Sequence, residues 1–261
     1  ASTALATLNA EFALNPNMLY ASHFGNLQFL HSMGTSDNSR EEVLTDVLDY
    51  IEYSWKLASG EVNHEAQSAK IDEVKTAHEE TSDDLSIVEN MIIKYPKSDM
   101  LFHSSNDEIL RQRALGSILH IVQDSYAKGH TVREDWESST SFEANSGKIR
   151  YFQSYSEQDG GKHGEHDTHD HGIEKWQDIP GAMTAFRKSS EIVKYFTLKC
   201  SYKNEFKIDD EQCPKDGMKS YFENEVFALA PYIDEENKII DYLNIFNQYD
   251  TSFTKSHESL K

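Results

Sequence analysis

Three residues of metal-ligand type are closely spaced near the middle of the chain, in the segment LHIVQDSYAKGH. His120 and Asp124 are four residues apart, so on a helix their side chains project from one face and can bind one ion together. His130 follows six residues after Asp124, just past Gly129, where the chain is expected to leave the helix. Imidazole and carboxylate are the ligands that zinc prefers when no thiolate is used. The segment therefore predicts a zinc site.

The surroundings of these ligands are apolar, which makes their presence costly unless they are bound. Ile118, Leu119, Ile121 and Val122 flank them on the same expected helix. An unsatisfied buried polar group costs about 1 to 3 kcal/mol, and a buried carboxylate stays ionised only when it is paired or metal-bound. The alternative is that the histidine and aspartate only hydrogen-bond each other as a core pair. Metal binding is favoured because more histidines, interleaved with carboxylates, occur between residues 163 and 171.

The motif resembles that of a known family, the zinc-dependent bacterial phospholipases C and the related fungal single-strand nucleases. In that family a central helix carries His-x-x-x-Asp and, six residues later, another His, here His120, Asp124 and His130. A His-x-x-x-Asp or His-x-x-x-Glu pair then completes the family's site. The chain offers this pair twice, as His163 with Asp167, which we prefer, and as the overlapping His166 with Asp170. The resemblance covers roughly residues 106 to 170.

The resemblance also implies ligands upstream of the central helix. The family has an Asp followed about fifteen residues later by a His, which Asp49 and His64 match. His23 and His31, in ASHFGNLQFLHSMG, are rival ligands. The implied fold is mainly α: a single helical domain over residues 1–261, with a long histidine-rich loop and a cluster of two or three zinc ions.

The chemistry that the resemblance implies is phosphodiester hydrolysis by water that the zinc ions activate. Asp124 is expected to bridge two ions, and an unligated carboxylate, with Asp49 the candidate, to orient the water as a general base. Arg133 and Arg150 are candidates for contact with phosphate, although a solvated surface charge is the simpler interpretation of each.

The sequence predicts several helices that position these residues. Ser39 and Glu42 form a capping-box pattern at the start of a helix over about 41 to 58. The strongest helix follows Asn106 and is expected to reach about Lys128. Further helices are expected over 71–95, from Pro180 to about 199, and over 233–248, with one strand near residue 150. EQDGGKHGEHDTHDHGIEKW lacks a hydrophobic period and is predicted to be a loop.

Composition limits the compartment and the partners. Cys200 and Cys213, the only cysteines, are thirteen residues apart and are predicted to form a disulfide, which favours a secreted or periplasmic protein. No run of about 18 apolar residues occurs, so no transmembrane segment is expected. The net charge of −20 repels nucleic-acid phosphates at long range, so binding of duplex nucleic acid is not expected.

Three classes of function remain at this point. The favoured one is a phospholipase C that contacts a membrane surface transiently and releases the head group of a lipid such as phosphatidylcholine. The second is a nuclease or nucleotidase of the same fold that cleaves single-stranded nucleic acid, for which basic grooves and aromatic platforms are needed. The third is a non-enzymatic zinc-binding protein, which the loop KHGEHDTHDH alone would suit. Ligands placed inside an apolar helix count against this third class.

Overall fold

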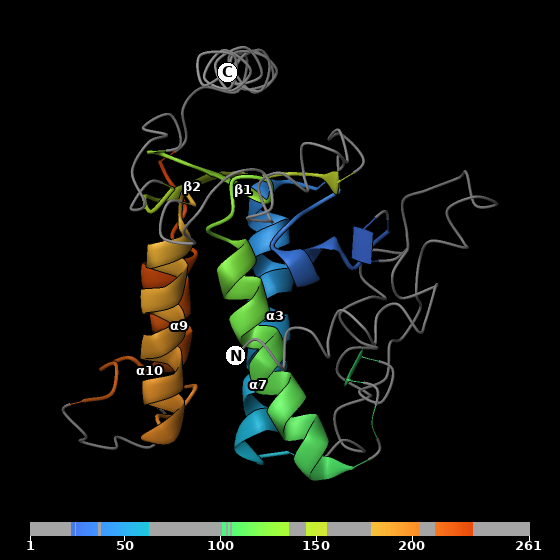
Figure 1. Ribbon diagram of the computed structural model, residues 1–261, viewed down its shortest axis with the longest axis vertical. Coiled ribbons are helices and arrows are strands. Elements are labelled where there is room, and N and C mark those ends of the chain that lie inside the picture. Colours follow the sequence, from blue (N-terminus) through green and yellow to red (C-terminus); the bar gives the residue numbers. More distant parts are fainter. Residues whose placement is uncertain are drawn as a thin grey trace, which may run out of the picture. The chain divides into compact units, whose positions relative to one another are not determined.

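Figure 1 shows the computed structural model, which describes residues 22–23, 25–35, 38–62, 101–102, 104, 106–135, 145–155, 179–203 and 212–231. Contacts between residues divide the chain into two units, Ala1–Leu229 and Ala230–Lys261. Of the second unit, the structure describes only residues 230 and 231. A single domain over 1–261 stays a prediction.

Helix α3 (Arg40–Ser59) confirms the helix expected over 41 to 58. The backbone N–H of Glu42 donates to the Ser39 hydroxyl (3.2 Å), and that of Ser39 donates to the Glu42 carboxylate (2.7 Å), which closes the capping box. The helix ends at Gly60, whose φ of 76° is in the left-handed region that favours glycine. Val47, Ile51 and Trp55 lie on its fully buried face.

Helix α7 (Asp107–Asp124) begins as predicted but ends earlier than the expected Lys128. At its start, the Asn106 side chain accepts hydrogen bonds from the N–H groups of Glu108 (3.0 Å) and Ile109 (3.2 Å). At its end, the Ser125 carbonyl accepts from the side chains of Thr131 and Arg133. The Val122 carbonyl accepts the Ser125 hydroxyl (2.7 Å), and the N–H of Tyr126 donates to the Gln123 carbonyl instead (3.1 Å), so the ladder stops at Asp124.

Helix α7 contacts two other helices. Helix α7 packs between α3 and α9 (Ala182–Thr197), and Figure 1 shows the three running side by side. Helix α9 begins after Gly181, which has a φ of 83°. A Cβ at Gly181 would lie 2.1 Å from the Tyr126 carbonyl oxygen, so the start of α9 can approach the end of α7 this closely only with glycine.

A short antiparallel hairpin covers the end of α7. Strand β2 (Ile149–Phe152) confirms the strand expected near residue 150, and it pairs with β1 (Thr131–Arg133), which was not predicted. The register shifts between Val132 and Arg133. Strand β1 gives no sequence signal, because it is only three residues long, all of them buried, and shows no alternation.

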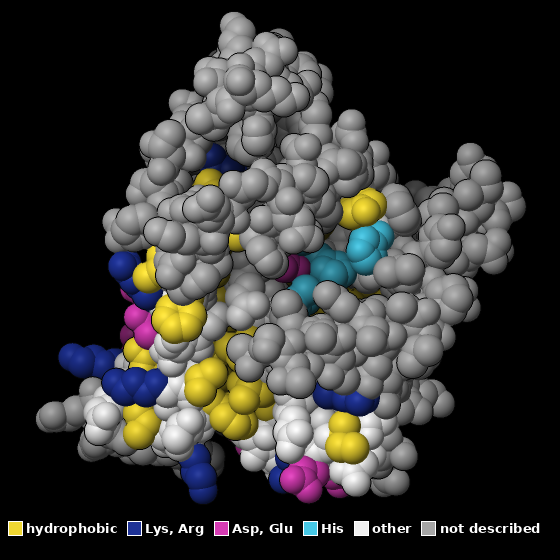
Figure 2. Space-filling model, in the orientation of Figure 1, with side chains coloured by type: hydrophobic (Ala, Val, Ile, Leu, Met, Phe, Trp, Pro, Cys, Tyr) yellow, Lys and Arg dark blue, Asp and Glu magenta, His cyan; other side chains and the backbone are white. Residues whose placement is uncertain are grey.

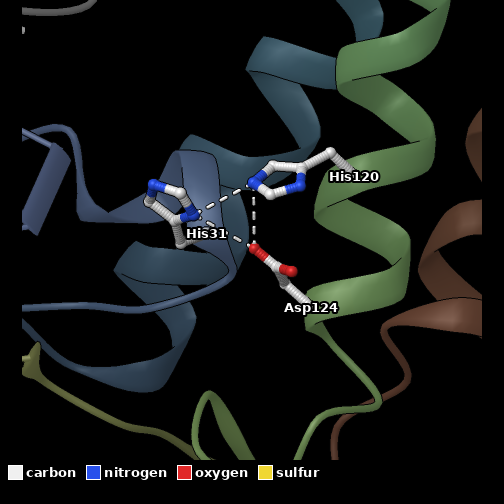
Figure 3. Close-up of side chains that lie close together, drawn as sticks. All are labelled: His31, His120 and Asp124. Atoms are coloured by element: carbon white, nitrogen blue, oxygen red, sulfur yellow. Dashed lines mark hydrogen bonds and ion pairs between the residues drawn. The ribbon is translucent and has the colours of Figure 1, made fainter. Parts of the chain in front are cut away.

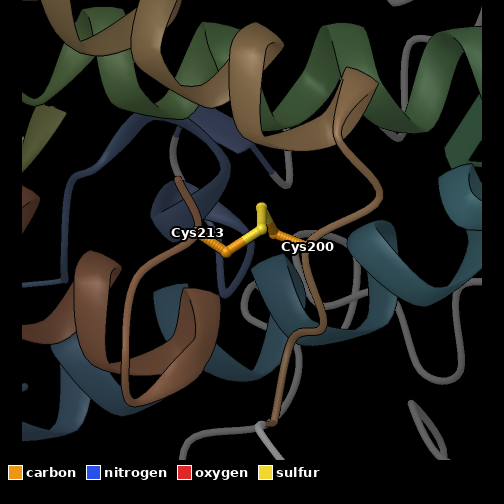
Figure 4. The surroundings of a disulfide bond; sticks show 2 residues. All are labelled: Cys200 and Cys213. Atoms are coloured by element: carbon orange, nitrogen blue, oxygen red, sulfur yellow. A yellow bond between two sulfur atoms is a disulfide. The ribbon is translucent and has the colours of Figure 1, made fainter. Parts of the chain in front are cut away.

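The predicted disulfide is present in the segment between α9 and α10 (Gly217–Tyr221). Figure 4 shows the bond between Cys200 and Cys213, whose Cα atoms are 5.6 Å apart. Helix α10 continues into a π-helical turn, η4 (Phe222–Val226). In the part of the chain that the structure describes, no helix has the length and apolar character needed to span a bilayer. The helices expected over 71–95 and 233–248, and the histidine-rich loop, lie outside the described residues.

Candidate metal centre

Three ligand atoms from two distant parts of the chain converge at the end of α7. His31 comes from the 3-10 turn η1 (Gln28–His31), and His120 and Asp124 come from the last turn of α7 (Figure 3). His31 Nδ1 is 3.0 Å from His120 Nε2 and 3.1 Å from Asp124 Oδ2. His120 Nε2 is 3.2 Å from the same carboxylate oxygen. Among the described residues, these three form the group of potential ligands whose donor atoms all lie within 4.8 Å of one another.

The spacing of the three atoms fits a bound transition-metal ion. Zinc bonds to nitrogen and oxygen of about 2.0–2.1 Å, at tetrahedral angles, place ligand atoms about 3.3 Å apart. The observed edges of 3.0, 3.1 and 3.2 Å need only a few tenths of an ångström of expansion. Two imidazoles and one carboxylate match the donor set of hydrolytic zinc sites.

While Asp124 is ionised, hydrogen bonding alone cannot make all three contacts favourable. A neutral imidazole nitrogen either donates or accepts. If both nitrogens donate to Asp124, two N–H groups face each other at 3.0 Å; if one nitrogen is deprotonated, its lone pair faces a carboxylate oxygen. A cation between the three atoms removes this conflict, because all three then direct lone pairs at positive charge.

His130 lies beside the triangle and is buried, with its side chain 3% exposed. Its Nδ1 is 3.7 Å from Asp124 Oδ2 and donates a hydrogen bond to the backbone carbonyl of His31. Since a carbonyl oxygen only accepts, the neutral ring carries its proton on Nδ1 and its lone pair on Nε2. A ring that donates one N–H to a carbonyl and keeps the other nitrogen as a lone pair is the usual arrangement of a metal-binding histidine.

Backbone hydrogen bonds join the segments that carry these ligands. The N–H of Gly34, three residues after His31, donates to the Gln153 carbonyl (2.9 Å). The N–H of Gln153 in turn donates to the His130 carbonyl (2.8 Å). The exit of β2 therefore fixes the η1 segment and the end of α7 to each other.

The site combines partial burial with an opening to the surface. The side chains of His31 and His120 are each 12% exposed and that of Asp124 is 16% exposed. Figure 2 shows histidine side chains close together on this face of the molecule, with an acidic side chain beside them. A fourth imidazole, that of His23, has its ring centre 4.9 Å from that of His31 and 4.8 Å from that of Tyr155.

The other predicted site residues have different positions. Asp49 lies on α3 with an exposed side chain, outside the group of three. Its charge reaches Tyr202, whose pKa is raised first by burial and then by the charges of Glu52, Glu223 and Asp49. Four loop residues and one upstream histidine fall outside the described residues: His163, Asp167, His166, Asp170 and His64. Their parts in the site stay predictions.

Arg133, named above as a candidate for phosphate contact, is instead part of the core. It is 2% exposed, and its guanidinium donates to the carbonyls of Ser125 (2.9 Å), Gly147 (2.8 Å) and Val226 (3.0 Å). The polar sequence around it gave no sign of this burial. Arg150 is half-buried and donates to the Glu134 carbonyl at 3.2 Å.

Comparison of the chain with protein-family models, with curated proteins and with solved structures found no match. The interpretation of the site therefore depends on its own geometry and donor chemistry.

Proposed function

We propose that this protein is a zinc-dependent phosphodiester hydrolase, and that its activity is that of a phospholipase C. The observation that carries the proposal is the triangle formed by His31 Nδ1, His120 Nε2 and Asp124 Oδ2, with edges of 3.0 to 3.2 Å. Two imidazoles and a carboxylate that converge at a partly exposed position suit metal-assisted hydrolysis.

Each residue of the site would have its own part in binding the metal ion. Asp124 supplies the negative charge that balances part of the metal's charge, and the two imidazoles fix the ion without adding charge. His130 lies outside this group of three; its Nδ1 donates to the His31 carbonyl, so a bond from this ring to a metal would have to use Nε2. A zinc ion bound there supplies a Lewis acid that polarises phosphoryl oxygens and lowers the pKa of a bound water.

The composition of the chain supports a lipid rather than a polyanion as substrate. Its 45 acidic residues outnumber the 25 basic ones, so a long nucleic acid is repelled. A choline or ethanolamine head group carries a cation that an acidic surface attracts. The disulfide supports an oxidising compartment, and we propose a secreted or periplasmic location.

Metal content and phosphodiesterase activity test the proposal together. The untagged protein is purified, and zinc per chain is measured by elemental analysis for the wild type, His120→Ala and Asp124→Asn. Asp107→Asn, at the opposite end of α7, is the matched control. We expect two or three zinc ions in the wild type and in the control, with loss of zinc and of p-nitrophenylphosphorylcholine hydrolysis in the other two.

The outcomes separate the three classes of function. A wild-type protein that binds no zinc would contradict the metal centre, and with it both the phospholipase and the nuclease hypotheses. Stoichiometric zinc without hydrolysis of any phosphodiester indicates the non-enzymatic zinc-binding protein. Zinc-dependent cleavage of single-stranded DNA without cleavage of lipid indicates the nuclease.

A further inference from the structure

The residue after His31 has a backbone conformation that its type disfavours. Ser32 has φ 52° and ψ 39°, in the left-handed region, where a residue with a Cβ is unfavourable. It ends η1 and is completely buried. A strained conformation persists only where the surrounding structure imposes it, and such positions concentrate at functional sites.

The contacts of Ser32 show what imposes this conformation. Its N–H donates to the Phe29 carbonyl at 3.0 Å, which closes the η1 turn. Its hydroxyl donates to the Ile121 carbonyl at 2.7 Å, a bond between residues 89 positions apart in the chain. The left-handed turn thus directs a buried hydroxyl from η1 onto the helix that carries the other ligands.

The acceptor is in the turn of α7 that holds the metal ligands. Ile121 directly follows His120 and belongs to the same final turn as Asp124. Its carbonyl also accepts the N–H of Ser125 at 3.0 Å, and a carbonyl has two lone pairs, so both bonds can coexist. The Ser32 hydroxyl therefore fixes the residue next to one ligand to the residue next to another.

We propose that Ser32 is a positioning residue of the metal centre, which, together with the backbone bonds through Gln153, sets the distance from His31 Nδ1 to the donor atoms of His120 and Asp124. This inference rests on the proposed metal site. A ligand set works only when it is held within about 0.5 Å of its productive geometry. His31 belongs to a four-residue turn that cannot hold such a position by its own hydrogen bonds, whereas His120 and Asp124 share one helix.

Two substitutions separate the hydroxyl from the backbone strain. Ser32→Ala removes the hydrogen bond and keeps the strained φ, whereas Ser32→Gly removes the bond and relieves the strain. We expect both variants to bind zinc 10- to 100-fold more weakly than the wild type, the range seen when the partner of a ligand is lost. Stability should differ between them, with the glycine variant the more stable.

Ser125→Ala is the matched control. Ser125 is also completely buried, and its hydroxyl donates to an α7 carbonyl, that of Val122, at 2.7 Å. This bond lies within α7 and its end and does not reach η1. We expect the control to lose stability and to keep wild-type zinc affinity.

The measurement is a competition titration of zinc against a chromophoric chelator, with the urea unfolding midpoint recorded for each metal-free variant. The visible spectrum of the cobalt-substituted protein reports the geometry of the ligands. We expect this spectrum to change in the two Ser32 variants and not in Ser125→Ala.

Wild-type zinc affinity and an unchanged cobalt spectrum in Ser32→Ala would overturn the positioning role and leave the metal site intact. Equal weakening in Ser125→Ala would also overturn it, because the effect would then follow stability. A wild type that binds no zinc would instead overturn the proposed function.

Discussion

A guanidinium group buried beyond the end of α7 holds together three segments near the candidate metal centre. Arg133 joins the Ser125 carbonyl and hydroxyl, the Gly147 carbonyl and the Val226 carbonyl, and it lies 4.0 Å from the centre of the Tyr126 ring. Burial lowers the pKa of this guanidinium, and the charges of Tyr126 and Asp135 counter that effect in part. The planar fork of donors matches its acceptors, which a lysine cannot do.

We therefore expect Arg133→Lys to lower the free energy of unfolding by about 3 kcal/mol, because it leaves buried carbonyls without donors. Urea denaturation monitored by circular dichroism measures this loss. Arg150→Lys, which changes a half-buried arginine of the same hairpin with one bond to the Glu134 carbonyl, should cost less than about 1 kcal/mol. Equal losses in the two variants would show that the network around Arg133 does not stabilise the fold.

Single residues also show what the sequence could not predict. The motif identified His120 and Asp124 because helical spacing alone puts them on one face. His31 could be named only as one of several upstream candidates, since its approach depends on a contact across 89 residues. The burial of Arg133 depends on acceptors as distant as Val226, 93 residues away, and no local pattern encodes it.

At the scale of elements, local signals predicted the helix starts and non-local bonds set the ends. The Ser39 and Asn106 caps act on the first turns that follow them, so sequence alone located both starts. The end of α7 was predicted four residues too late, and the Ser125 carbonyl just beyond it accepts bonds from β1 side chains that no local pattern indicates. Of the two strands of the hairpin, only β2 was predicted, since only β2 has a strand-like sequence.

A turn beyond β1 makes the stability of this hairpin depend on pH. The Asp135 carboxylate accepts hydrogen bonds from the N–H of Ser146 (2.8 Å), the Ser146 hydroxyl (2.9 Å) and the N–H of Gly147 (2.8 Å). Burial alone would raise the pKa of Asp135, but these bonds outweigh burial and lower it. A carboxyl with a lowered folded pKa stabilises the protein above its ordinary pKa, and this contribution is lost as pH falls through the folded value.

Asp135→Asn should therefore lower the free energy of unfolding by about 1 to 2 kcal/mol at pH 7. The difference from wild type should stay constant down to about pH 4, the ordinary pKa of Asp, and shrink at lower pH. Urea titrations at several pH values between 7 and 3 measure it. Glu134→Gln makes the same change of charge at the adjacent exposed residue, whose carboxylate accepts one 3.3 Å bond from Lys148 N–H, and should show little loss. A difference that grows as the pH falls would contradict the role assigned to Asp135.

At the scale of the whole molecule, the net charge would repel an anionic substrate that the proposed metal centre would attract. The net charge of −20 raises the free energy of any polyanion approaching the surface. A phosphate at the metal centre gains from the local positive charge of the ion, which outweighs the distant field only at short range. A substrate with one phosphodiester and a cationic head group meets both conditions, whereas a long single strand must place many phosphates near acidic side chains.

We accordingly expect faster hydrolysis of phosphatidylcholine in mixed micelles than of single-stranded DNA, at equal phosphodiester concentration and moderate salt. Phosphocholine release is compared with release of acid-soluble nucleotide, each with added zinc and again with a chelator, and His120→Ala controls for contaminating enzymes.

Raising the salt from about 0.1 M to 1 M shortens the screening length from about 10 Å to 3 Å. Any cleavage of DNA should therefore become faster as salt is added, because the repulsion is screened. Cleavage of lipid should become slower, because the attraction between the cationic head group and acidic side chains is screened as well. Chelator-sensitive DNA cleavage that falls with salt, with no release from any phospholipid, would require a basic binding groove and would assign the protein to the nucleases.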